Sequence, residues 1–182
     1  MQSLPSDMRS DVFKIVLKNG GDEAFKQVLG YFDTATDNAE KKHVLSSIGV
    51  TPDVGKKLEV LEWTTSGAVK LQDFFYAIGS VHSSGKEGRE LAWKFFKDNL
   101  GKFKGMLGKA SASLMDAVIA LSCREFSSFE KADEIETFFD GADLPQNKRK
   151  VEQVIESIRA NAAFLGLLEK SELTDKKFWD GL

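Results

Sequence analysis

Few side chains in this sequence have the chemistry that catalysis needs. The chain holds two histidines, His43 and His82. A zinc hydrolase commonly presents two histidines four residues apart, as in H-E-x-x-H, and neither histidine has such a neighbour. Two lysines precede His43 and would repel a cation, and His82 lies in a serine–glycine stretch. We therefore expect both histidines to be solvated residues at helix ends.

The single cysteine and the acidic residues also lack the partners of a reaction centre. A cysteine nucleophile requires a nearby imidazole base and an oxyanion hole, whereas Cys123 follows an apolar helical stripe. We expect an inert, partly buried thiol. The neighbouring acids Asp133, Glu134 and Glu136 are better explained as the solvated face of an amphipathic helix than as an acid–base pair.

One segment superficially resembles a phosphate-binding P-loop, from Gly79 to Lys86. Five residues separate its glycines where the motif has four, and Glu87 occupies the position that needs a hydroxyl for Mg²⁺. What remains is the start of a helix, where free N–H groups beside Lys86 and Arg89 form a candidate site for a carboxylate or another small anion. The alternative is a helix start capped by Ser84 and Glu87, with two exposed cations.

Helices must position all of these residues. The three prolines lie where helices can begin, apolar residues recur at spacings of three and four, and no window alternates as a strand does. Glycines between the apolar stripes can adopt the left-handed conformation that ends a helix. About nine helices result, over residues 6–19, 22–35, 38–48, 52–65, 71–82, 85–103, 111–125, 129–140 and 145–169, with a weaker one near 171–179.

The apolar stripes predict which face of each helix is buried. Those of the first and the last long helix are formed by Met8, Val12, Ile15 and Val16, and by Val151, Val154, Ile155, Ile158, Ala162 and Leu165.

Successive helices begin about 14 to 19 residues apart over most of the chain, so helix pairs repeat at the period of helical repeat proteins. This favours an all-α fold of stacked antiparallel helix pairs, a HEAT- or armadillo-like superhelical array, over an irregular bundle, which stays open. No linker divides the chain, and we expect one domain over residues 1–182.

Composition excludes several classes of protein. The net charge is −3, so there is no basic excess for tracking a nucleic acid, and the apolar runs are too short to span a membrane. One cysteine permits no internal disulfide, and the first residues do not form a secretory signal. A cytoplasmic location is the expectation.

Three motifs, in matching order across nearly the whole chain, carry a family resemblance: Arg9–Phe13 with Leu17–Gly21, Gly88–Asn99 with its A-W-x-F-x-x-x-N pattern, and Ile158–Leu165. Together they resemble the C-terminal helical domain of M1-family zinc aminopeptidases, in particular the puromycin-sensitive branch.

The resemblance implies a domain that walls and caps the chamber in which a hydrolase of the metalloprotease class removes N-terminal residues from peptides. Zinc and the catalytic residues would belong to a separate catalytic domain, so no catalytic or metal residue is expected here. The implied partners are the catalytic and linking domains of the parent enzyme and the peptide substrate. Some relatives carry a basic side chain where this chain has Ala117, so that contact is not expected here. A peptide-carboxylate contact at Lys86 and Arg89 is our separate hypothesis, which rests on their position at a helix start.

Two other functions remain open. A free-standing helical-repeat adaptor would bind protein partners along its concave face and would begin naturally at Met1. A self-contained hydrolase would use Cys123 or the scattered acids.

Overall fold

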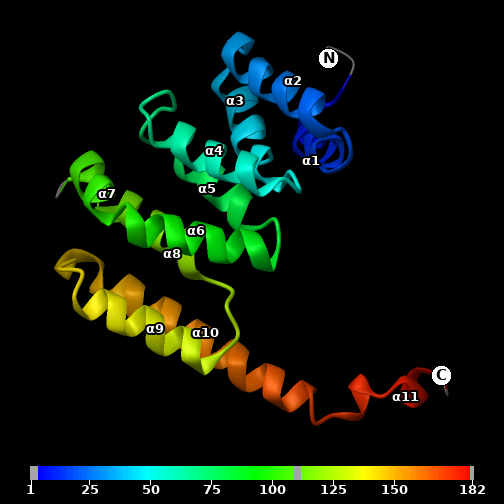
Figure 1. Ribbon diagram of the computed structural model, residues 1–182, viewed down its shortest axis with the longest axis vertical. Coiled ribbons are helices and arrows are strands. Elements are labelled where there is room, and N and C mark those ends of the chain that lie inside the picture. The colour runs from blue at the N-terminus through cyan, green and yellow to red at the C-terminus, as the bar shows by residue number, and fades with distance from the viewer. Residues whose placement is uncertain (1–3, 109–111, 181–182) are drawn as a thin grey trace. The chain divides into compact units, whose positions relative to one another are not determined.

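The computed structural model describes residues 4–108 and 112–180, and within these ranges every regular element is a helix (Figure 1). This confirms the prediction of an all-α helical array. Contacts divide the chain into two compact units, Met1–Ser122 and Cys123–Leu182. The single domain and the HEAT-like superhelix stay predictions.

The first unit begins with a short 3₁₀ turn, η1 (Ser6–Met8), and continues through consecutive helices, several of which pack on the next one along the chain. These elements are α1 (Arg9–Asn19), α2 (Gly21–Thr34), α3 (Asn38–Leu45), η2 (Ile48–Val50), α4 (Val54–Thr64), α5 (Phe75–His82), α6 (Lys86–Asp98), α7 (Leu100–Leu107) and α8 (Ala112–Cys123), whose last residue falls in the second unit.

In the second unit, α9 (Phe129–Asp140) lies beside the long α10 (Lys148–Leu168), as Figure 1 shows. The 3₁₀ turn η4 (Pro145–Asn147) leads into α10, and η5 (Glu172–Thr174) and α11 (Lys176–Asp180) follow it. Pro145 stands at the first position of η4, as its fixed φ and missing N–H favour.

The helix expected over 85–103 is two helices. The Asn99 side chain donates to the carbonyl of Phe95 at 2.9 Å, and the Asn99 backbone N–H shares the same acceptor at 3.1 Å. The Asn99 side chain thus competes with its own backbone N–H for a helical carbonyl at the break between α6 and α7. The helix expected from residue 71 also begins later, at Phe75, since the preceding residues form turns in which the N–H groups of Asp73 and Phe74 both bond the carbonyl of Lys70, at 2.9 and 3.1 Å.

Aromatic rings fill the centre of the first unit. Phe96 stacks on Trp93 and on Phe103, with centroids 6.0 and 5.5 Å apart, and Phe74 lies 6.2 Å from Phe103. All four rings are fully buried. This agrees with the aromatic content of the α6 motif and fixes α5, α6 and α7 against one another.

Candidate functional site

The predicted anion site lies where α5 turns into α6. Gly85 precedes the helix with a φ of 123°, a left-handed conformation that suits glycine, and no side chain caps the first turn. The predicted capping by Ser84 is wrong, because its hydroxyl donates to the carbonyl of Val81 at 2.7 Å. The first N–H groups of α6 therefore lack a side-chain acceptor, as an anion site requires.

Lys86 and Arg89 lie on the first turn of α6, Lys86 exposed and Arg89 half-buried. Neither has a hydrogen bond or an ion pair with the part of the chain that the structure describes. Glu87, between them, is directed elsewhere: its carboxylate meets the ammonium of Lys57, a buried lysine of α4, at 3.3 Å. The two cations keep their charge available to a ligand, and their role stays a prediction.

A hollow of about 500 Å³ runs along α6, and neither predicted cation lines it. Its lining is Glu87, Glu90, Leu91, Trp93, Lys94, Lys97 and Asp98. Glu87 and Glu90 line the end of the hollow that is nearest the predicted anion site. Their negative charge disfavours binding of an anion in the hollow.

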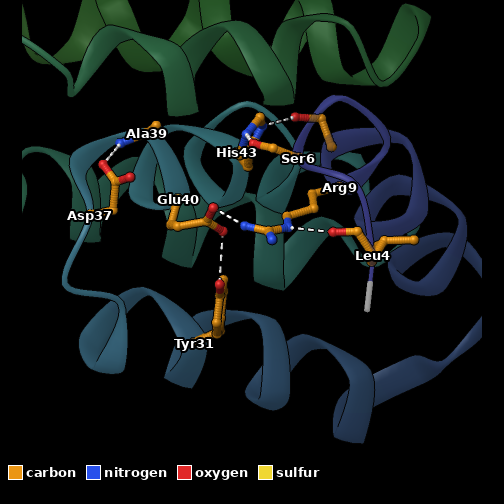
Figure 2. Close-up of polar contacts among 9 residues, drawn as sticks. Leu4, Ser6, Arg9, Tyr31, Asp37, Ala39, Glu40 and His43 are labelled. Atoms are coloured by element: carbon orange, nitrogen blue, oxygen red, sulfur yellow. Dashed lines mark hydrogen bonds and ion pairs between the residues drawn. The ribbon is translucent and has the colours of Figure 1, made fainter. Parts of the chain in front are cut away.

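A second polar cluster joins the N-terminal segment to α3 (Figure 2). The His43 ring shares hydrogen bonds with two serine hydroxyls, Ser10 Oγ at 2.8 Å from Nδ1 and Ser6 Oγ at 3.2 Å from Nε2. His43 lies in the last turn of α3, at a helix end as predicted, and is half-buried; what the sequence did not predict is that both ring nitrogens are engaged across a tertiary contact.

The same face of α3 carries Glu40, which receives a second set of contacts (Figure 2). One carboxylate oxygen pairs with the Arg9 guanidinium, and the other accepts from the Tyr31 hydroxyl at 2.8 Å. Arg9 Nε also donates to the carbonyl of Leu4 at 3.2 Å. We call these residues, with Ser6, Ser10 and His43, the N-terminal clasp.

The N-terminal clasp is not arranged for nucleophilic catalysis. A serine nucleophile needs a histidine whose other nitrogen is oriented by a further group, usually a carboxylate. Here both ring nitrogens face hydroxyls, and the nearby carboxylate of Glu40 is held by Arg9 and Tyr31. The cluster instead ties η1 and α1 to α2 and α3.

His82 and Cys123 are both fully buried. His82 is the last residue of α5, at the helix end that the sequence predicted, and the Ser83 N–H bonds the carbonyl of Gly79 at 2.9 Å; the expectation that His82 is solvated is wrong. Burial raises the pKa of the Cys123 thiol well above its ordinary value, because the thiolate would lose its hydration. The prediction of an inert thiol agrees with this environment.

The acids of α9 form its solvated face, as predicted, and bind α10. Arg159 donates to Asp133 at 2.9 Å and to Glu136 at 2.7 Å, and these two hydrogen bonds raise the pKa of the guanidinium. Glu134 pairs with Lys131 within α9 at 2.7 Å. The acids of α9 therefore form ion pairs within α9 and between α9 and α10.

Among the described residues, no group of three or more histidine, cysteine, aspartate or glutamate side chains gathers as a metal site. His43 is hydrogen-bonded to two serines, and His82 is fully buried at the end of α5. The residues present do not fit a catalytic zinc ion. In the same ranges, no helix combines the length and apolar character that crossing a membrane demands.

The fold and these contacts define an all-α helical array whose first unit has an aromatic core. Residues 1–160 match the family model described as the ERAP1-like C-terminal domain. The chain therefore belongs to that family.

Curated relatives are aminopeptidases. The chain is 30% identical to aminopeptidase M1 of Arabidopsis thaliana, over 93% of this chain and 19% of the relative. It is 25% identical to the puromycin-sensitive aminopeptidase of Caenorhabditis elegans, over 87% and 17%, and 26% identical to endoplasmic reticulum aminopeptidase 1 of Rattus norvegicus, over 90% and 17%. The chain thus spans less than a fifth of the length of these three relatives.

Proposed function

We propose that this chain is the noncatalytic C-terminal domain of a zinc aminopeptidase of the puromycin-sensitive type. In this proposal it walls and caps the chamber in which N-terminal residues are removed from peptides. Membership of the ERAP1-like C-terminal domain family is the observation that carries the proposal. Its partners would be the catalytic and linking domains of the parent enzyme, which would hold the zinc ion.

The parent enzyme tests this role. We expect its full reading frame to encode a zinc-site module upstream of residues 1–182. Deleting these residues from the enzyme should leave hydrolysis of a small aminoacyl-coumarin substrate measurable but change the dependence of the rate on peptide length. A reading frame without such a module, or an unchanged length dependence in the folded truncated enzyme, would reject the proposal.

A peptide-carboxylate contact at Lys86 and Arg89 belongs to the same proposal. The uncapped first turn of α6 and the two unpaired cations support it. We expect the Lys86→Ala/Arg89→Ala variant of the chain to bind a short peptide with a free carboxylate several-fold more weakly than the parent chain. A peptide amide is the matched ligand without the charge. Unchanged affinity for the carboxylate peptide would remove these residues from the proposal.

A cytoplasmic location completes the proposal, supported by a buried thiol that needs no oxidising compartment. The relatives vary in this respect: one is named for the endoplasmic reticulum, and a yeast relative, aminopeptidase 2, is named mitochondrial. Fractionation of cells that express the full reading frame tests the location directly.

The adaptor alternative draws support from exposed apolar side chains near the end of the chain. Phe164, Leu167 and Trp179 are 62%, 69% and 57% exposed. Such residues suit contact with a protein partner, but they suit an interface with other domains of one enzyme equally well. The upstream reading frame separates the two functions.

A further inference from the structure

A groove lies between α9 and α10, and its lining residues have no role in the proposed function. It encloses about 350 Å³, at the small end of the range for ligand sites. Its apolar lining includes Val151 and Ile155, both buried, and Phe139 and Leu144, both half-buried. This volume and lining suit one or two side chains of a peptide.

Charged side chains edge the groove, and most of them are acidic. Four carboxylates line it against one ammonium group, that of Lys148. Two of the four are compensated: Glu136 binds Arg159 at 2.7 Å, and Glu152 lies 3.9 Å from Lys148. The other two, Asp140 and Asp143, have no hydrogen bond or ion pair with described residues.

The position of Asp140 strengthens the negative potential at this edge. Asp140 is the last residue of α9, where the helix dipole is negative, and Asp143 follows in the connection to α10. An acid at the C-terminal end of a helix does not stabilise that helix. A cation with an apolar stem or an apolar neighbour would complement both the edge and the lining.

We propose that this groove binds an arginine-bearing segment of a polypeptide, with the guanidinium at Asp140 and Asp143 and the adjoining apolar side chain on Leu144 and Ile155. Arginine suits the site because its planar, weakly hydrated fork bonds more than one carboxylate and stacks on a ring such as Phe139. This inference does not rest on the proposed function.

Fluorescence anisotropy of the 182-residue chain with a labelled peptide, acetyl-Gly-Leu-Arg-Leu-Gly-amide, tests the proposal. We expect saturable binding that weakens with salt, since the carboxylates at the edge are exposed. The same peptide with citrulline in place of arginine keeps the shape without the charge and should bind about fivefold or more weakly. Equal binding of the two peptides, or no saturable binding at all, would overturn the proposal.

Two double variants test whether the carboxylates of Asp140 and Asp143 bind the arginine. Asp140→Asn/Asp143→Asn should weaken binding of the arginine peptide by about fivefold or more. Asparagine also tolerates the left-handed backbone of Asp143, whose φ is 46°, so the fold should persist. Glu156→Gln/Glu169→Gln removes the same charge from exposed positions outside the groove and should change the affinity less than twofold. Equal losses in both double variants would show diffuse attraction and reject the site.

Amide chemical shifts of the chain provide a readout of position. The arginine peptide should shift the signals of residues 139–144 and of the first turns of α10. Shifts centred on the hollow along α6, or an equal response to free spermidine at the same concentration, would contradict a peptide site between α9 and α10.

Discussion

At the scale of single residues, the polar contacts of this protein serve to join helices. Glu40 and His43 each bind two partners in the N-terminal clasp, and Lys57 meets Glu87 between α4 and α6. Sequence reasoning missed these roles because the partners in the N-terminal clasp lie up to 37 residues apart. A signal exists in hindsight, since Ser6, Arg9 and Ser10 share one face of the first helix at spacings of three and four.

The N-terminal clasp leads to a first prediction. Glu40→Gln should lower the free energy of unfolding by about 2 kcal/mol, because Arg9 would lose its anionic partner in a site where both side chains are less than a fifth exposed. Urea unfolding followed by circular dichroism measures the change. The exposed pair of Lys94 and Asp98 provides the control, and Asp98→Asn should cost less than about 0.5 kcal/mol. Equal effects would show that the clasp is ordinary surface.

A second prediction concerns the ion pair of Asp22 and Lys56, which makes the stability of the fold depend on pH. Lys56 lowers the pKa of Asp22, first through its hydrogen bond and then through its charge. Because the folded pKa is below the unfolded one, the contact stabilises the fold above the ordinary carboxyl pKa of about 4, and the contribution disappears as the pH falls through the lowered value.

An NMR titration of the Asp22 carboxyl tests this. In Lys56→Gln the pKa of Asp22 should return toward its ordinary value, whereas Lys26→Gln, which removes a smaller influence, should leave the pKa lowered. A pKa that stays low without Lys56 would contradict the assignment.

At the scale of elements, apolar spacing predicted the helices well and their orientation less well. In α10 the predicted stripe is buried from Val151 to Ala162, but Leu165 is 40% exposed. In α1 the stripe was placed on the wrong face: Phe13 and Leu17 are buried, whereas Ile15 is 62% exposed. A larger aromatic ring and a leucine four residues on determine the buried face, because they bury more apolar area than the residues counted in the stripe.

The crossing of α5 and α6 yields a third prediction. A Cβ at Gly88 would lie 2.1 Å from the carbonyl oxygen of Val81, a backbone atom that cannot move without separating the helices. Gly88→Ala should therefore destabilise the protein by about 3 kcal/mol. Gly101 in α7 has open space, and Gly101→Ala should stabilise it by about 0.5–1 kcal/mol. Thermal unfolding of both variants checks the signs, and a neutral Gly88→Ala would refute the close crossing.

At the scale of the whole molecule, fold and family were predictable and the site was not. Helical periodicity, helix starts and stops, and three motifs in order are local features of sequence, and the all-α fold and the family follow from them. Lys86 and Arg89 lie on the first turn of a helix, as predicted. Whether a ligand binds there depends on the residues that face this turn, which the local sequence does not reveal. The groove between α9 and α10 could not be predicted, because it joins residues of two helices and their connection.

We expect this chain to be a helical domain that catalyses no peptide hydrolysis by itself. The most direct test is hydrolysis of aminoacyl-coumarin substrates by the purified 182-residue chain in buffer that contains zinc. We expect a rate of hydrolysis equal to that of the buffer alone. Turnover above this rate that a metal chelator abolishes, or that Cys123→Ala abolishes, would contradict it.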